Sequence, residues 1–179
     1  GTGTNTLTFD GHAGNLLISA DVGDSPGSGS TNVGLRVGGN NIVFHPTFAP
    51  TPGAFRVEGA GGFGNQDMGF IPAGTVLHNM EVAVDAATGR FTIAVADANN
   101  PDNVYAARFT NAGYSPGTDQ IGFKYGSGSG GDQGRYDNLV VSQLNQSTPG
   151  NANWVSAIAD SNPLHWYRFA EAGNIAIHY

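Results

Sequence analysis

Core-type and polar residues alternate through residues 75–97, and this stretch carries the clearest structural signal in the chain. Every second residue of two runs is suited to a core, and these positions are Val76, His78, Met80, Val82, Val84, Phe91, Ile93 and Val95. A period of two places alternate side chains on one face of a β-strand. Residues 85–90 lie between the runs and supply the aspartate and glycine that tight turns favour. The stretch therefore predicts an antiparallel hairpin with one face turned to a core.

The same alternation recurs along most of the chain up to residue 144. Residues 33–37 alternate Val33, Leu35 and Val37 with Gly34 and Arg36, and Gly38 to Asn41 reads as a turn. Residues 120–126 place Ile121, Phe123 and Tyr125 on one face and Lys124 on the other. Other strand-like runs occupy residues 4–22, 42–46, 54–59, 104–110 and 135–144, whereas the glycine-rich residues 59–74 read as a loop.

These short strands, punctuated by glycine, proline and asparagine, predict an all-β fold. Strands of this kind at a spacing of about 8–12 residues are typical of a two-sheet sandwich or jelly roll. No helix longer than one turn is expected before residue 150. The expected fold class is a two-sheet antiparallel jelly-roll sandwich with a C-terminal strand-like tail.

Composition narrows the class of partner. Charged residues make up 12% of the chain, about half the usual share, and the net charge is −7, with Lys124 the single lysine. A nucleic-acid partner is disfavoured, because phosphate binding needs clustered Lys and Arg. Membrane insertion is not expected, because no run of about 18 apolar residues occurs. The chain has no cysteine, which excludes disulfides and thiolate metal sites.

The order of these elements resembles a known family. A strand, the GFGNQDMGF segment, the EVAVDAATGRFT hairpin and IGFKYG followed by YDNLVVS are similar to the concanavalin A-like lectin/glucanase jelly roll. They resemble in particular the laminin-G-like modules of secreted multidomain bacterial proteins, over residues 5–143. The resemblance implies an extracellular or cell-surface, non-catalytic adhesive or structural module of lectin type. The alternatives are a carbohydrate-binding module of a polysaccharide-processing protein and, less favoured, a glycoside hydrolase.

The chain divides into a jelly-roll domain (1–146), a linker (147–153) and a tail (154–179). The tail resembles the first strand of a following laminin-G-like module, and its aromatic residues are Trp154, Trp166, Tyr167 and Phe169. So apolar a strand is an aggregation hazard when exposed. Two explanations stay open: the chain is a fragment cut at a domain boundary, or the tail is donated to a neighbouring copy. Head-to-tail donation can build a homopolymer or filament.

No catalytic signature is present, and the chain is not expected to be an enzyme. A glucanase of this fold would carry an E-x-D-x-x-E strand that places a nucleophile and an acid on one face. The nearest segment, Glu81 to Asp85, lacks that spacing and the third acid, and Asp85 belongs to the turn. His45 and His78 are interpreted as hydrogen-bonded structural residues.

Calcium is the expected cofactor, if any. Related jelly rolls often tie their first and last strands together with a structural Ca²⁺ held by oxygen ligands. The resemblance points to Asp137 in the final strand, with Asp10 as its partner, and residues 21–24 form a second acidic candidate, read as a loop. The alternative is that Asp137 only caps a turn.

Glycan binding needs aromatic and polar side chains on loops or on one face of a sheet. The segment Phe63, Asn65, Gln66 and Asp67 offers such a set. The remaining candidates lie opposite the apolar positions of their strands, where they could line a groove: Arg36, Arg56 and Lys124. Each of these is also interpretable as an ordinary solvated strand residue. The expected partners are therefore a glycan or other copies of the chain.

Overall fold

The computed structural model describes residues 2–10, 15–24, 31–46, 51–73, 75–115, 118–127 and 134–144. These residues form eleven β-strands and no helix. The strands are β1 (Thr2–Asp10), β2 (Asn15–Asp24), β3 (Thr31–Val37), β4 (Asn40–Phe44), β5 (Ala54–Glu58), β6 (Phe63–Asp67), β7 (His78–Asp85), β8 (Arg90–Ala96), β9 (Val104–Thr110), β10 (Thr118–Ser127) and β11 (Gly134–Leu144). The described part of the chain thus contains no helix that could cross a membrane.

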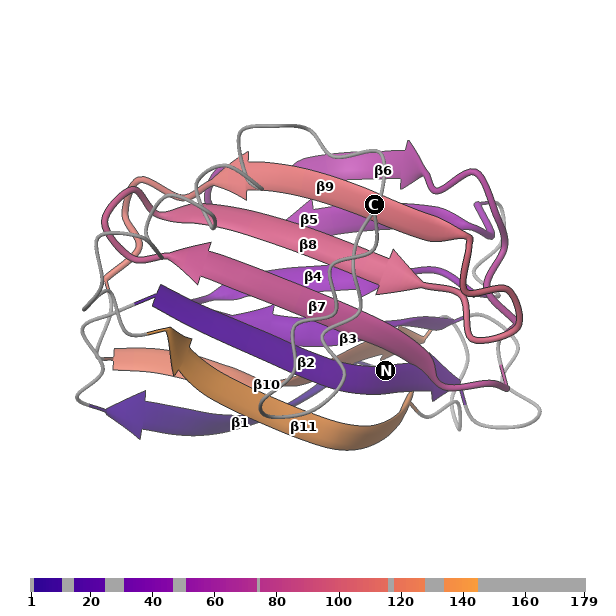
Figure 1. Ribbon diagram of the computed structural model, residues 1–179, viewed down its shortest axis with the longest axis horizontal. Coiled ribbons are helices and arrows are strands. Elements are labelled where there is room, and N and C mark those ends of the chain that lie inside the picture. The colour runs from indigo at the N-terminus through magenta and orange to yellow at the C-terminus, as the bar shows by residue number, and fades with distance from the viewer. Residues whose placement is uncertain are drawn as a thin grey trace, which may run out of the picture.

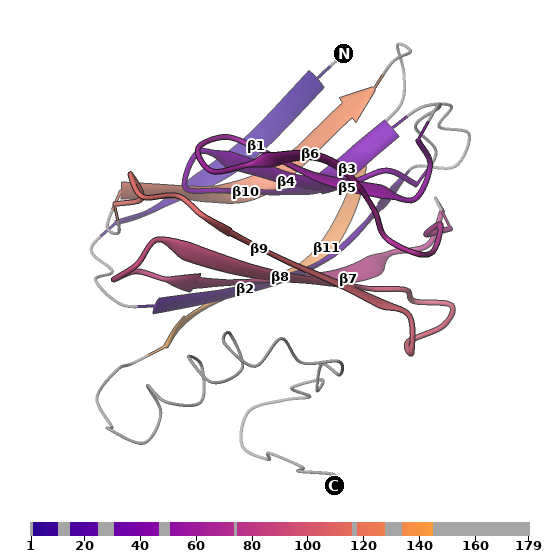
Figure 2. The same cartoon turned by 90° about the horizontal axis from the view of Figure 1, so that it is seen from above.

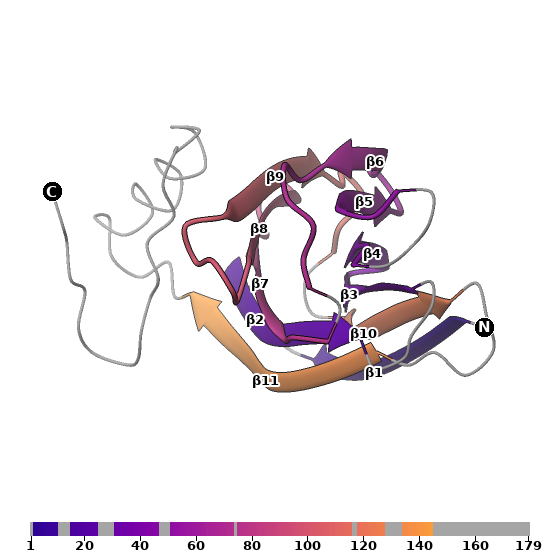
Figure 3. The ribbon, with the colours of Figure 1, turned by 90° about the vertical axis from the view of Figure 1, so that its right-hand side faces the viewer.

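The strands form two antiparallel sheets that pack face to face (Figures 1 and 2). One sheet has six strands in the order β1-β10-β3-β4-β5-β6, and the other has five in the order β11-β2-β7-β8-β9. β1 and β11 lie along one edge of the sandwich, and β6 and β9 lie along the other (Figures 1 and 3). This arrangement confirms the predicted all-β jelly-roll sandwich.

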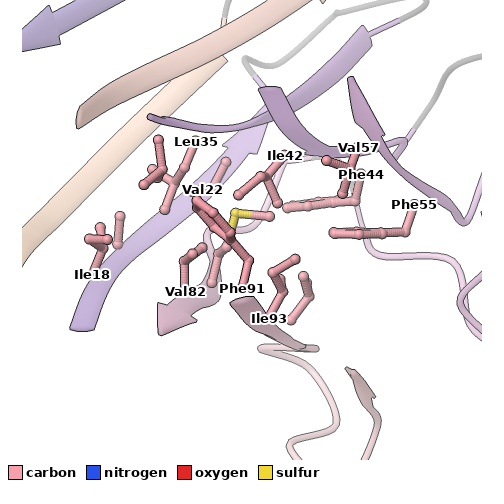
Figure 4. Packing of buried hydrophobic residues seen from close by; sticks show 14 of the residues in the cluster. Ile18, Val22, Leu35, Ile42, Phe44, Phe55, Val57, Val82, Phe91 and Ile93 are labelled. Carbon is pink, nitrogen blue, oxygen red and sulfur yellow. The ribbon is translucent and has the colours of Figure 1, made fainter. Parts of the chain in front are cut away.

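The predicted hairpin is present and lies inside the five-stranded sheet. Val84 pairs with Phe91 and Asp85 with Arg90, and burial alternates along the whole of β7. Seven of the eight predicted core positions are buried, and Val76, which precedes the strand, is partly exposed. Inward-facing residues of both sheets interdigitate in the core (Figure 4), including Ile18, Leu35, Ile42, Phe44, Phe55, Val82, Phe91 and Ile93.

Two local predictions are wrong. Residues 59–74 are not entirely loop, because Phe63–Asp67 form β6 at the edge of the six-stranded sheet. Backbone hydrogen bonds to β5 make this strand, and they need no alternation of side chains. Residues 21–24 are not a loop either, since they lie in β2 between β11 and β7.

The linker and the tail lie outside the described residues. The predicted boundaries 147–153 and 154–179, and the assembly role of Trp154, Trp166, Tyr167 and Phe169, therefore stay predictions.

The six-stranded sheet is not flat. The N-terminal end of β1 and the C-terminal end of β10 bend away from the five-stranded sheet (Figure 2).

Candidate binding face on the six-stranded sheet

Strand register brings three of the predicted binding residues to one face. Lys124 pairs with Gly34, Gly34 with Val43 and Val43 with Arg56, so these residues form one row across β10, β3, β4 and β5. Arg36 lies two residues from Gly34 along β3 and therefore points to the same side. Their strand neighbours, such as Leu35 and Phe55, point into the core. The outward side of this sheet, called the outer face below, thus gathers Arg36, Arg56 and Lys124.

A hydrogen-bonded network crosses the outer face from β3 to β5. Arg36 Nη1 donates to Asn41 Oδ1 at 3.1 Å, and Asn41 Nδ2 donates to Glu58 Oε2 at 3.0 Å. The other oxygen of Glu58 forms an ion pair with Arg56 Nη2 at 2.5 Å. Both oxygens of Glu58 are thereby engaged, and each of the four side chains is held by another. The network orients planar polar groups before any ligand arrives.

The face is not an ordinary solvated surface. Val43 is completely buried although it points outward, and Lys124 is 9% exposed. The Arg56 side chain is 29% exposed, and its Nε is buried without a hydrogen-bond partner among the described residues. Lys124 is thus mostly buried, whereas Arg56 keeps part of its side chain exposed, and the interpretation of Arg56 as an ordinary solvated strand residue stays a prediction.

A second group of polar residues borders the row at the β4–β5 end. His45 Nδ1 lies 3.4 Å from Thr51 Oγ1, and Asn65 Nδ2 on β6 donates to the same hydroxyl at 3.4 Å. Burial lowers the pKa of His45 to about 4, with further lowering by Arg56 and an opposing contribution from Glu58. His45 is therefore uncharged at neutral pH, as expected for a structural histidine.

The predicted residues of β6 divide between the two sides of the sheet. Phe63 pairs with Val57 and Gln66 with Phe55, so both lie on the core-facing side. The Phe63 ring packs against Phe55 with centroids 6.0 Å apart, so it forms no exposed platform for a sugar. Asn65 and Asp67 lie on the outer side.

Asp67 has a local role as well. Its Oδ1 accepts a hydrogen bond from Gly69 N at 2.8 Å, which shapes the turn that follows β6. Asn65 is therefore the residue of this segment that joins the outer face through a side-chain contact.

Sequence reasoning missed Asn41 and Glu58, the two central members of the network. The sequence did hold a signal for Asn41, because the adjacent glycines Gly38 and Gly39 favour a two-residue hairpin turn. In the structure both glycines adopt positive φ and form that turn. Such a turn fixes Arg36 opposite Asn41. Glu58 gave no comparable signal, because the connection from β4 to β5 is long and its register cannot be counted from a turn type.

The predicted calcium residues are not brought together. Asp137 pairs with Asp21, near the end of β2, whereas Asp10 ends β1, shortly before β2 begins. The backbones of Asp10 and Asp137 therefore lie toward opposite ends of the sandwich. Among the described residues, no group of three or more His, Cys, Asp or Glu side chains could hold a metal.

The carboxylates of Asp21 on β2 and Asp137 on β11 already accept hydrogen bonds from amide groups. Asp21 accepts from Asn138 Nδ2 at 2.7 Å and from Asn79 Nδ2 at 3.3 Å. Asp137 Oδ1 accepts from Asn138 N at 2.8 Å, at a bulge where Asn138 has φ of 52°. These N–H donors can stabilise the two carboxylates without a metal ion, so the two residues do not by themselves favour calcium. The calcium prediction stays untested.

The remaining titratable groups of interest have structural partners. His78 accepts from Ala98 N at 3.1 Å through Nδ1, and its Nε2 donates to the Ala73 carbonyl at 2.8 Å. Its predicted structural role is confirmed. Asp85 accepts from Ala87 N and from the Thr88 hydroxyl, which confirms that it belongs to the turn.

Comparison with known proteins identifies the fold as one shared with other β-sandwich structures. Neither a protein-family model nor a curated protein sequence matches the chain. The CBM2 module of the evolved Dit of Lactobacillus casei BL23 phage J-1 is similar in structure, with a TM-score of 0.54 and 11% identity. That match covers 80% of this chain and 70% of the module.

Two further structures show the breadth of this fold. A lectin from Bauhinia forficata in complex with GalNAc has a TM-score of 0.52 and 10% identity, over 80% of this chain and 81% of the lectin. The enzymatically active domain of bacteriophage CBA120 tailspike protein 2 has a TM-score of 0.50 and 10% identity, over 86% of this chain and 25% of that one. The chain thus has the β-sandwich architecture of the lectin and carbohydrate-binding-module structures, in agreement with the coarse resemblance seen in the sequence. At such identities the likeness shows the fold alone.

Proposed function

We propose that this chain is a non-catalytic carbohydrate-binding module that holds an oligosaccharide on the outer face. The observation that carries the proposal is the Arg36–Asn41–Glu58–Arg56 network. Binding sites for small polar ligands use a few side chains whose orientation is fixed in advance. Amide and guanidinium groups held in this way can hydrogen-bond sugar hydroxyls without first losing side-chain freedom. The fold shared with a lectin and a carbohydrate-binding module supports this use.

The proposal is of binding without hydrolysis. A glycosidase commonly needs two carboxyl groups that flank the scissile bond, one as an acid and one as a base or nucleophile. On the outer face Glu58 is engaged through both oxygens, and Asp67 is engaged in a turn at the edge strand. This arrangement favours an orienting role for Glu58.

The biological setting is proposed from the sequence resemblance. We place the module in an extracellular or cell-surface protein, in an adhesive or structural role, with laminin-G-like relatives. The aromatic residues of 154–179 support head-to-tail assembly as a further part of the proposal. Size-exclusion chromatography of the chain with and without residues 150–179 tests it, because equal apparent masses would contradict donation of the tail.

Screening on a glycan array, followed by calorimetric titration of the best ligand, tests the binding proposal. Asn41→Ala removes both hydrogen bonds of the central amide, and we expect it to weaken binding at least tenfold. Arg108→Gln on β9 is the matched control, because Arg108 pairs with Thr92 in the other sheet. Equal affinities of Asn41→Ala and the parent, with unchanged thermal unfolding, would place the site elsewhere.

A further inference from the structure

We propose that the outer face selects an anionic saccharide, one that carries carboxylate or sulfate groups. This inference rests on the proposed carbohydrate binding and names the chemical class of ligand. It follows from the position of the cations, from the balance of hydrogen-bond donors and acceptors, and from the surroundings of Lys124.

The outer face is less acidic than the chain as a whole. The chain has a net charge of −7 with seven Lys and Arg in all. Three of these cations, Arg36, Arg56 and Lys124, share one face of one sheet. Three carboxyl residues fall on the same side by strand register: Glu58 within the network, Asp67 at the β6 edge, and Asp10 at the end of β1. Cations and carboxylates are therefore equal in number on this side, although acids outnumber bases twofold in the chain, and Glu58 is the carboxylate held within the network between the cations.

The network also leaves donors in excess. Arginine and lysine side chains only donate hydrogen bonds, and an ionised carboxylate only accepts them. Both oxygens of Glu58 are used by Asn41 and Arg56, and the Asn41 oxygen is used by Arg36. Arg56 Nε still lacks an acceptor among the described residues. A ligand group that only accepts, such as a carboxylate or sulfate, complements this surplus better than a hydroxyl does.

Lys124 gives the strongest local argument. It is 9% exposed, and no carboxylate of the described residues lies within ion-pair distance of its ammonium group. Lys124 pairs with Gly34 on β3 and with Thr4 on β1, and Gly122 and Gly126 are its nearest neighbours on this side of β10, so none of these four neighbours is a carboxylate. A lysine often covers its neighbours with its methylene stem and keeps its ammonium group in contact with water. An anionic group of the ligand would supply an opposite charge for this ammonium group.

The spacing of the cations favours an oligomeric ligand. Lys124 and Arg56 lie in one row, three strand steps apart. At about 4.8 Å per step their backbones are separated by about 14 Å. A saccharide with charges on successive residues can reach both ends of the row, whereas a single small anion cannot.

A nucleic acid would offer repeated anions too, but the described side chains of the outer face include no aromatic ring. Binding of single strands relies on aromatic side chains on which bases stack. The Phe and Tyr rings of β4, β5, β6 and β10 pack against the core, among them Phe55, Phe63, Phe123 and Tyr125. The saccharide is therefore the favoured ligand, and a nucleic acid becomes an outcome of the test.

The test compares matched ligands that differ in charge. An oligogalacturonate and its methyl-esterified form share one backbone, and sulfated and plain dextran oligosaccharides form a second pair. We expect at least one charged member to bind tenfold or more tightly than its neutral counterpart, and its affinity to fall as salt rises from 50 to 500 mM. Lys124→Met and Arg36→Gln, each checked by thermal unfolding, are expected to weaken that binding at least fivefold. Arg108→Gln should leave it unchanged.

Other outcomes overturn the inference in distinguishable ways. Equal binding of charged and neutral members contradicts anion selection but leaves carbohydrate binding intact. Equal binding of a single-stranded oligonucleotide with the same number of charges shows a general anion surface rather than a saccharide site. If neither the array nor the titrations find a glycan that binds, both the inference and the proposed function on which it rests are contradicted.

Discussion

The hydroxyl of Tyr136 donates a 2.7 Å hydrogen bond to the backbone carbonyl of Lys124. This bond joins β11 of the five-stranded sheet to β10 of the six-stranded sheet. The Tyr136 ring also stacks on Phe123, with centroids 4.4 Å apart. Burial raises the pKa of Tyr136, and Asp24 and Tyr125 raise it further, so the hydroxyl keeps its proton and remains a donor. The bond therefore holds the segment that carries Lys124 against the other sheet.

Removing this hydroxyl should destabilise the fold. Tyr136→Phe leaves the Lys124 carbonyl without this donor, and we expect the free energy of unfolding to fall by about 1 kcal/mol. Urea denaturation measures the change. Tyr105→Phe is the control, because Tyr105 packs on Phe55 and its hydroxyl makes no hydrogen bond with another described residue. A smaller loss for Tyr136→Phe than for the control would contradict the role of the bond.

Gly134 makes room for the same tyrosine. A Cβ at this position would overlap the Tyr136 hydroxyl. We expect Gly134→Ala to displace the ring and to lower the free energy of unfolding by about 1–2 kcal/mol. Combined with Tyr136→Phe, its effect should be less than additive, because both changes disrupt one bond. Gly64→Ala is the control, since its Cβ would meet no atom within 4 Å.

Protonation of His45 should weaken the fold in acid. Its pKa lies near 4 in the folded chain against 6.5 for the ordinary side chain, so below pH 6.5 the unfolded state binds more protons. Stability is then complete above pH 6.5 and is lost as the pH falls toward 4, at up to about 1.4 kcal/mol per pH unit. His45→Gln should lack this component. Parallel curves of unfolding free energy against pH for parent and variant would contradict the prediction.

Asn138 combines a backbone role with a side-chain role at the β11 bulge. Its φ of 52° is unfavourable for most residues, and its amide donates to Asp21. Asn138→Ala should lower the free energy of unfolding by about 1–2 kcal/mol, because it adds backbone strain and removes the donor. Asn138→Gly removes the donor alone and should cost less. Thermal unfolding of both variants separates the contributions, and an equal loss would contradict a backbone role.

Calcium can be tested on the same chain. Because amide groups already donate hydrogen bonds to Asp21, we expect EDTA to leave the unfolding midpoint of the chain unchanged within about 1 °C. A midpoint that falls with EDTA and recovers with added Ca²⁺ would instead support the calcium predicted from the sequence, and it would direct attention to Asp10 and Asp137 separately.

The parts of the fold that sequence alone predicted are those set by local periodicity. In β7 and β8 the side chains alternate strictly, and a turn with Asp85 and Gly89 joins them, so face and pairing follow from the sequence. The same holds for Arg36, Lys124 and Arg56, whose direction from the sheet was predicted correctly. Their meeting on one face depended on which strands are neighbours, which periodicity does not encode.

The parts that sequence missed depend on contacts distant along the chain. β6 shows no alternation, and it exists because β5 offers a free edge for backbone pairing. The burial of Lys124 and Val43 could not be predicted, since a period of two gives the direction of a side chain and says nothing of what lies over it. Glu58 became visible as a partner of Asn41 only through the register of β4 and β5.

The row of cations makes the outer face less acidic than a chain whose net charge is −7. Near a negatively charged polymer this face would be repelled less than the remaining surface. Such a molecule would turn as it approaches and dock in a single orientation, with the five-stranded sheet facing the solvent. Copies spread along one polymer would then all present the same side to whatever comes next.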